Sequence, residues 1–474
     1  MFGRLVQKEL RHHLLDFRFV AVFAFCALLS ALSVYMGVQG YTRQLREYSA
    51  VSENNRRAFQ EKSIDQGRLF DLYWYGYQWN RRPEVLSLVV FGLAGSQGRE
   101  AFVGYQNTPL FEASIFETDP IHALFEVLDL AFVVKVVLSL CVLLFTYDAV
   151  CGEKESGTLR LYSSFPVSRS VLALAKLVGS TLAILVPLVF AFLLASAVLA
   201  LSPGVGLGAE DWIRIAVLMG VFALYLMVFS AFGLFVSALT HRRMTAFLGL
   251  LGLWTVWVFV VPNLAVDVAR RLVPVQSYYG QQKEELGVRW KIKTGGAAEM
   301  RALWERTRVE DWDALSEARR EQVRRQRSEG GYQIGTRWDR KYFSDLRDLN
   351  AKRRNRMRSQ QRTAMALSAV SPFGAVSFLS TDLARTGFVQ QERLEDALNG
   401  YLIYLAGFIH EKRRESGSMF QGADMTGFSW FTHRDTEGIG ECLIRNAFHI
   451  LNLVLLMLVG FAGAYVAILR YDVR

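Results

Sequence analysis

Six long apolar runs constrain the fold of this 474-residue chain more than any other feature of its sequence. Each run is long enough to cross a bilayer, and each is expected to be a helix because hydrocarbon offers the backbone no water to bond. The mean hydropathy is +0.19 although 21% of the residues are charged, so very apolar segments alternate with very polar ones. The sequence therefore predicts an all-α polytopic membrane protein with runs near residues 18–37, 128–147, 171–201, 212–239, 244–262 and 446–469.

The short connections between the runs predict the topology. Lys or Arg occurs in the N-terminal segment, in the connection after the second run, in the turn at 241–243 and in the C-terminal tail, but not in 202–211. By the positive-inside rule, both termini are then cytoplasmic. The expected segments are a first transmembrane helix at 17–40, a second at 126–147, helices three to five within 171–262, and the sixth helix with its cytoplasmic tail at 446–474.

Two long segments are left on the outer side, and we call them the first insert (41–125) and the second insert (263–445). The first contains the aromatic stretch FDLYWYGYQWNRRPEVLSLVVFGLAG, which predicts a packed subdomain near the headgroups. The second carries 31 Lys and Arg against 24 Asp and Glu and has helical spacing of apolar residues. We expect a helical hairpin there with a turn at Glu329-Gly330-Gly331, a break at Ser371–Gly374, and a core helix at Tyr401–Ile409.

Residues 1–16 precede the first run and have the pattern of an amphipathic helix. Basic side chains lie away from the apolar face, which suits a helix in the cytoplasmic membrane interface. A frayed terminus is the alternative. The residues of the apolar face are Phe2, Leu5, Val6, Leu10 and Leu14.

The connection after the second run, 148–170, has two glycines with the spacing of a phosphate-binding loop. That motif also needs a lysine and a hydroxyl residue after its second glycine. Here Thr158 and Leu159 occupy those positions, and the preceding segment is a membrane helix. The chain is therefore not expected to bind ATP or to be an enzyme.

The whole connection reads as G-E-x-E-x-G-T-L followed by F-P-x-S-R, placed between two apolar helices. This pattern resembles the ABC-2 type family of ABC transporter permeases, as do the basic N-terminal helix, the number of spans and the cytoplasmic termini. The large second insert is similar to the subgroup linked to multicopper-enzyme maturation, with a DUF3526-type domain. The residues that carry the loop pattern are Asp148, Gly152, Glu153, Glu155, Gly157, Thr158, Leu159, Pro166 and Arg169.

The resemblance implies a multi-pass exporter subunit in the bacterial inner membrane whose connection 148–170 docks on a separate ATPase. Two such chains, identical or related, would pair and recruit two ATPase subunits, which would hold the ATP and Mg while this chain needs no cofactor. We expect Glu153 and Glu155 to pair with basic groups of the ATPase, with the glycines allowing tight turns and Pro166 ending the loop. The alternatives are force transmission to an extracytoplasmic partner without transport, and a receptor or scaffold that works without ATP.

Other charged residues raise further possibilities. Lys135 lies within the second run, where a charge costs roughly 2.5–3.5 kcal/mol, so it is a candidate for the translocation path. Snorkelling of its long side chain toward the interface is the alternative. The basic run Lys352, Arg353, Arg354, Arg356 and Arg358 suits anionic lipid headgroups, an acidic partner or an anionic substrate, or is a solvated helix face. Its expected outer location excludes nucleic acid.

No metal site is predicted. His410-Glu411 begins like the zinc motif H-E-x-x-H, but Arg414 stands where its second histidine is required. Gly460 and Ala464 form a small-x-x-x-small pair that would permit close helix contact. The substrate and the direction of movement do not follow from the sequence.

Overall fold

The computed structural model describes residues 2–105, 111–112, 128–158, 168–202, 205–416 and 422–470. It divides into two compact units. The first comprises residues up to Asn263 together with those from Ser368 onward, and the second comprises Leu264–Leu367.

Six helical stretches of the described chain are long and apolar enough to cross a membrane, which confirms the predicted spans. The first, second and fifth include polar turns after their apolar parts, so they extend beyond those parts. The stretches are Phe17–Ile64, Leu130–Glu155, Ser170–Leu201, Ala209–Leu239, Arg243–Leu272 and Ala447–Leu469.

Most of the described chain is helical. In chain order, the first unit begins with α1 (Phe2–Leu15), α2 (Phe17–Phe59), the π-helical turn η1 (Gln60–Ile64), α3 (Leu69–Trp74), β1 (Tyr77–Asn80), the 3₁₀ turn η2 (Val85–Leu88), β2 (Glu100–Val103) and β3 (Phe111–Glu112). It continues with α6 (Leu130–Phe132), the π-helical η3 (Val133–Leu138), α7 (Ser139–Thr146), α8 (Cys151–Glu155), α10 (Arg169–Leu201), α11 (Ala209–Leu239), α12 (Arg243–Thr255) and the π-helical η4 (Val256–Val260). After α13 (Val261–Leu272), α14 (Tyr278–Arg306) and α15 (Glu317–Ser368), the chain ends with α16 (Pro372–Leu383), α17 (Phe388–Ser416), α18 (Ile439–Arg445) and α19 (Ala447–Leu469).

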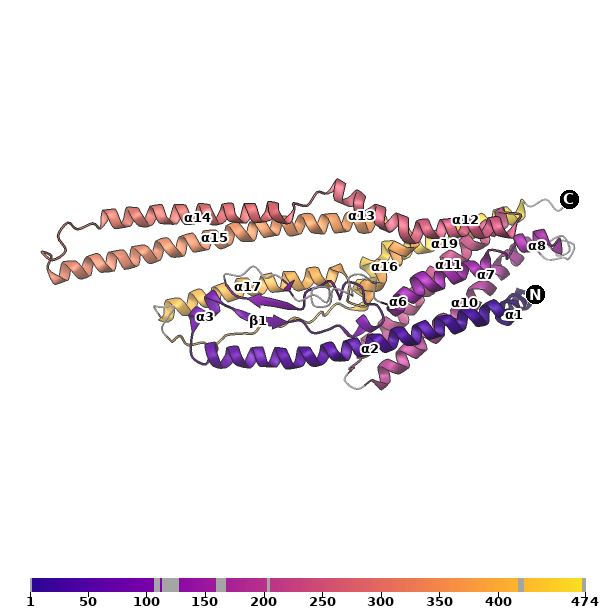
Figure 1. Ribbon diagram of the computed structural model, residues 1–474, viewed down its shortest axis with the longest axis horizontal. Helices are drawn as coiled ribbons and strands as arrows, with labels where there is room; N and C mark the ends of the chain where they lie inside the picture. Colours follow the sequence, from indigo (N-terminus) through magenta and orange to yellow (C-terminus); the bar gives the residue numbers. More distant parts are fainter. Residues whose placement is uncertain are drawn as a thin grey trace. The chain divides into compact units, whose positions relative to one another are not determined.

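Helix α2 runs without interruption from the first span into the first insert. It begins at Asp16, whose side chain accepts a hydrogen bond from the Arg18 amide at 3.0 Å. Its 43 residues give a length of about 65 Å, whereas the hydrocarbon core is about 30 Å thick. The span and the first part of the insert are therefore one rigid rod, which Figure 1 shows passing α10 and reaching β1.

The last span packs closely on α11. A Cβ on Gly460 would lie 2.9 Å from Phe232 Cδ2, and one on Gly463 would lie 2.7 Å from Phe235 Cε2. Ala464 is fully buried in the same contact. The expected role of Gly460 and Ala464 in close helix packing is confirmed.

The two inserts share one aromatic core. Buried residues of α3 and β1 pack with residues of α17 and of the segment 423–431, so Tyr401–Ile409 is a core helix as predicted. Tyr77 of β1 donates to Tyr401 and accepts from the Phe431 amide at 2.8 Å. The sequence did not predict the antiparallel sheet β1-β2-β3. Its strands are too short to show alternation.

The second unit is a helical hairpin of α14 and α15, lying side by side in Figure 1. The prediction that Glu329-Gly330-Gly331 forms its turn is wrong, because α15 runs through those residues and the turn lies at 307–316. The glycines instead leave room for side chains of α14. The Leu303 methyls lie 2.9 Å from a Cβ placed on Gly330, and Trp338 fills the space beside Gly295 in the same way.

The helix break at Ser371–Gly374 is confirmed. α15 ends at Ser368, and the Ser371 side chain caps α16 by accepting from the Gly374 amide at 3.2 Å. The same hydroxyl donates to the Trp257 carbonyl at 2.6 Å, which ties the break to the fifth span.

Candidate functional site

The residues after the second span form a short helix, α8, that is fastened to α11. The Ser237 hydroxyl accepts from the amides of Val150 at 3.0 Å and Cys151 at 3.1 Å, so it satisfies donors at the start of α8. The Lys154 ammonium donates to the carbonyls of Ala238 and Thr240 at the end of α11. The first half of the connection 148–170 is thus held against the fourth span.

Lys176 joins three helices at one point. Its side chain, on α10, is 4% exposed, and its Nζ lies 2.7 Å from Glu153 Oε1 of α8 and 3.5 Å from Glu9 Oε1 of α1. A buried charge is tolerated only when it is paired, and here one cation faces two carboxylates. We call Glu9, Glu153 and Lys176 the ion cluster.

A glycine makes the ion cluster possible. A Cβ on Gly179 of α10 would lie 2.6 Å from the Cβ of Glu9. Real Cβ contacts are wider than this, so any larger residue would force α1 away from α10 and separate Glu9 from Lys176. The N-terminal helix is therefore a packed element, which is more than the interfacial helix that its amphipathic pattern predicts.

Two further ion pairs surround the cluster. Arg18 Nη1 at the start of α2 lies 3.1 Å from Asp148 Oδ2, and Arg243 Nε at the start of α12 lies 3.6 Å from Glu155 Oε2. Both pairs are partly exposed, so each contributes at most about 1 kcal/mol to stability. Their effect is positional, because they connect the same short segment to the first and fifth spans.

The glycines of the connection have different roles. Gly157 has φ +75°, a left-handed conformation that suits glycine at the end of α8, as the expectation of a tight turn requires. Gly152 lies inside α8, where a Cβ would be 3.1 Å from Arg243 Nε. Thr158 donates to the Glu153 carbonyl at 3.4 Å. Leu159 and Pro166 lie outside the described residues, and Arg169 is described only as the first residue of α10.

The acidic residues of the connection also have partners within the chain. Glu153 pairs with Lys176 and the half-exposed Glu155 pairs with Arg243, so both help to position the connection, and their expected pairing with basic groups of the ATPase stays a prediction. Glu153 Oε2 is buried with no hydrogen-bond partner among the described residues. The sequence did not single out Glu9 or Ser237. Lys176 within an apolar run was the available signal, because an ammonium group there needs a counterion.

Comparison with known proteins agrees with this architecture. The model of the ABC-2 family transporter proteins matches residues 4–473, nearly the whole chain. This chain belongs to the ABC-2 transporter family. Two curated relatives are both named probable ABC transporter permease protein NosY: one from Stutzerimonas stutzeri is 33% identical over 133 residues, covering 28% of this chain and 48% of the relative. The other, from Pseudomonas aeruginosa, is 32% identical over 131 residues, covering 26% and 45%. The matches thus span about half the length of these relatives.

Family membership makes this chain a multi-pass membrane protein of the permease type. ABC-2 permeases are associated with ATPase subunits. Of the three helices at the ion cluster, α8 lies in the connection 148–170, and the role of that connection in binding the ATPase stays a prediction. The subgroup linked to multicopper-enzyme maturation stays a prediction. Among the described residues, no group of three or more His, Cys, Asp or Glu side chains is placed to hold a metal.

Lys135 of this ABC-2 family member lies in the π-helical turn η3 of the second span. Its ammonium group lies 3.4 Å from the Ser377 hydroxyl and 5.3 Å from the centre of the Phe373 ring, both on α16. The Tyr225 hydroxyl donates to its carbonyl at 2.7 Å. Lys135 is therefore half-buried against α16, and its role in a translocation path stays a prediction.

The basic run lies on α15 in the second unit. Lys352 and Arg356 are exposed, whereas Arg353, Arg354 and Arg358 are half-buried along the hairpin. The run is thus a partly solvated helix face. A role in binding an anionic partner stays a prediction.

Proposed function

We propose that this chain is the membrane subunit of an exporter-type ABC transporter, and that α1, α8 and the rest of the connection 148–170 receive the ATPase. The family match supports the transporter assignment, and the ion cluster supports the location of the contact. The chain would act as a pair, most simply a homodimer, with two ATPase subunits that hold ATP and Mg. Its location would be the bacterial inner membrane with both termini in the cytoplasm.

The observation that carries the proposal is the convergence of α1, α8 and α10 on Lys176. Displacement of α1 or α8 by a partner would move α10 directly, since a buried ion pair resists separation in a low dielectric. The pairs Arg18–Asp148 and Arg243–Glu155 extend the same motion to two more spans. The arrangement is suited to converting ATPase closure into tilting of the spans.

The first test removes one charge of the cluster. In the single variant Lys176→Gln, two carboxylates lose their cation, and we expect a loss on the order of 3 kcal/mol of unfolding free energy in detergent. The triple variant Glu9→Gln, Glu153→Gln, Lys176→Met removes the charges together, so most of that stability should return. A triple variant as unstable as the single one would contradict the pairing.

The same triple variant tests coupling. We expect it to insert and assemble with the ATPase, while stimulation of ATP hydrolysis by the membrane subunit falls to the level of the ATPase alone. The matched control is Glu53→Gln with Arg57→Met, an exposed pair on α2 with Nε 2.6 Å from the carboxylate. Stimulation at the wild-type level in the triple variant would overturn the proposed contact.

A second candidate function is force transmission to an outer partner without transport. The continuity of α2 from its contact with Asp148 to the aromatic core at Phe59 favours it, because tilting of the span would carry the insert with it. Family membership favours either ATP-linked function over a receptor that works without ATP.

A further inference from the structure

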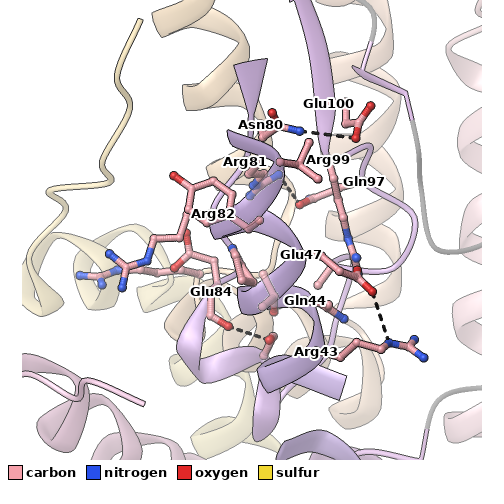
Figure 2. Close-up of a pocket in the computed structure, with 17 residues that line it drawn as sticks. Arg43, Gln44, Glu47, Asn80, Arg81, Arg82, Glu84, Gln97, Arg99 and Glu100 are labelled. Atoms are coloured by element: carbon pink, nitrogen blue, oxygen red, sulfur yellow. Dashed lines mark hydrogen bonds and ion pairs between the residues drawn. The ribbon is translucent and has the colours of Figure 1, made fainter. Parts of the chain in front are cut away.

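A pocket of about 480 Å³ lies in the first unit, just beyond the apolar part of α2. One wall is α2 from Arg43 to Val51, and the others are the residues between β1 and η2, the segment before β2, and the turn after α16. Figure 2 shows that the side chains lining the pocket come from these separate segments. A volume of this size holds a small molecule or a lipid headgroup and excludes a folded partner.

The pocket is lined by five arginines and three glutamates, with no lysine. The guanidinium groups of Arg82 and Arg99 form no hydrogen bond or ion pair with a described residue. Two of the three carboxylates have local partners: Glu100 accepts from Gln78 and Asn80, and Glu47 lies 3.9 Å from Arg43. The arginines are Arg43, Arg81, Arg82, Arg99 and Arg385, and the glutamates are Glu47, Glu84 and Glu100.

Arg81 is held in the pocket by two neutral side chains. Its Nη1 donates to Gln97 Oε1 at 2.7 Å and to Gln391 Oε1 at 3.0 Å. These amides orient the guanidinium group but do not neutralise its charge. Burial lowers the pKa of Arg81, with Glu84 and Asp435 opposing the shift, and burial likewise lowers the pKa of Arg99, with Glu47 opposing it. Both guanidinium groups would therefore gain from an anion in the pocket.

Arg385 occupies a strained position at the edge of the pocket. Its φ of 58° is left-handed, and the bonds from its amide to Asp382 and from the Thr386 amide to Thr381 form the helix end at which glycine is usual. A side chain there costs on the order of 1 kcal/mol or more. Its guanidinium lies 3.1 Å from Glu210 Oε1 and 3.6 Å from Asp211 Oδ1, so this arginine is held by two carboxylates at the edge of the pocket.

We propose that this pocket binds the phosphate group of a small organic phosphate, supplied either as a soluble ester or as a phospholipid headgroup. Guanidinium groups match the paired oxygens of phosphate, which explains the use of arginine without lysine. The pocket begins at Arg43, one turn beyond the apolar run, so a lipid headgroup is within reach as well as a soluble ligand.

The binding test uses glycerol 3-phosphate and the full-length protein in a neutral detergent at constant ionic strength. Calorimetry should detect binding of the ester and none of glycerol. The double variant Arg82→Gln, Arg99→Gln should weaken binding by at least about 10-fold, since each lost contact is a charge-assisted hydrogen bond. Arg46→Gln is the matched control, because Arg46 is an exposed arginine of α2 that does not line the pocket.

A second arm separates the two sources of phosphate. Protein from vesicles of phosphatidylcholine mixed equally with phosphatidylglycerol should retain phosphatidylglycerol in native mass spectrometry, and the double variant should not. Retention of this lipid without binding of the ester identifies a headgroup, and binding of the ester identifies a soluble ligand. If neither binds, or if Arg46→Gln loses as much affinity as the double variant, the proposal is overturned.

A variant that is expected to bind the ester more tightly tests whether weaker binding by the arginine variants is caused by misfolding. Glu47→Gln removes a rim carboxylate whose ion pair is exposed, so we expect binding to strengthen roughly 2-fold. Weaker binding in this variant would contradict an anion site. None of these measurements involves an ATPase, so their failure would leave the coupling proposal untouched.

Discussion

At the residue scale, two buried cations, Arg214 and Lys176, are each held by more than one polar group. Arg214 is fully buried and donates to Glu210 at 2.8 Å, to the Leu383 carbonyl at 3.1 Å and to the Glu437 carbonyl at 2.6 Å. Lys176 faces two carboxylates in the same manner. Breaking one partner of such a group costs more than the group contributes when intact, because the remaining charge stays buried. These residues therefore determine which helices can meet.

His13 gives the N-terminal helix a dependence on pH. Burial lowers its pKa below 6.5, opposed by Glu9 and Asp148 and reinforced by His12 and Lys176. The folded state thus binds the proton more weakly than the unfolded state. The stability of α1 packing is fully present above pH 6.5 and is lost as the pH falls through the lowered value. We expect hydrogen exchange of the α1 amides, corrected for the intrinsic rate, to be faster at about pH 5 than at about pH 7.5.

Two variants test this assignment. His13→Gln cannot titrate, so the pH dependence of exchange in α1 should flatten. His12→Gln removes an exposed neighbour and should leave most of it in place. An unchanged pH dependence in His13→Gln would assign the effect to another group.

At the element scale, glycine placement determines how closely helices pack. Gly179 admits Glu9, Gly460 and Gly463 admit phenylalanines of α11, and Gly295 admits Trp338. Glycine within a helix costs about 0.5–1 kcal/mol relative to alanine. At these contacts the closer packing of the two helices offsets that cost. This explains why Gly330, which belongs to the predicted turn, lies in a continuous helix against Leu303.

Two glycine variants of the hairpin should change its stability in opposite directions. Gly331→Ala places a Cβ 3.7 Å from Met300 Cε, an ordinary contact, so a helical residue there should gain about 0.5–1 kcal/mol. Gly295→Ala places a Cβ 2.2 Å from Trp338 Cη2, so it should cost on the order of 1–3 kcal/mol. In the full-length protein, local hydrogen exchange of α15 should slow in Gly331→Ala, and that of α14 should accelerate in Gly295→Ala. Faster exchange of α15 in Gly331→Ala would indicate that Gly331 lies in a turn and not in a helix.

At the scale of the whole molecule, α2 links the site of proposed ATPase contact to the aromatic core of the inserts. Arg18 at its start pairs with Asp148, and Phe59 at its end packs on Tyr77 and Trp430. Gly40 lies where the apolar part ends and has open space where a Cβ would be. A rod of this kind transmits rotation of the span to the insert only while its hydrogen bonds are continuous.

Gly40→Pro should break that continuity. Proline removes a backbone donor and clashes with the preceding turn, at a cost of about 3 kcal/mol to the local helix. In the assembled complex we expect nucleotide-dependent changes in proteolysis of the insert to disappear, while stimulated ATP hydrolysis continues. Gly40→Ala keeps the helix and is the control. Persistence of the nucleotide-dependent changes in Gly40→Pro would show that α2 is not the connection.

The spans, the coarse position of the loop and the transporter family were predictable because they depend on local sequence. In hydrocarbon a segment satisfies its own backbone only as a helix, so about 20 apolar residues suffice to predict one. The loop pattern is likewise contiguous. The sheet was missed because its strands have four, four and two residues, too few to show a period.

The local sequence does not reveal which residues pair in the ion cluster or meet in the pocket. Lys176 was visible as a cation in an apolar run, but Glu9 and Glu153 are its partners because Gly179 lets α1 pack on α10 and Ser237 holds α8 on α11. The arginines of the pocket come from α2, two loops and a helix end, and no spacing in the chain connects them. Local hydrogen bonding specifies the helices, whereas the free energy of burying charges and fitting side chains against glycines specifies which residues meet.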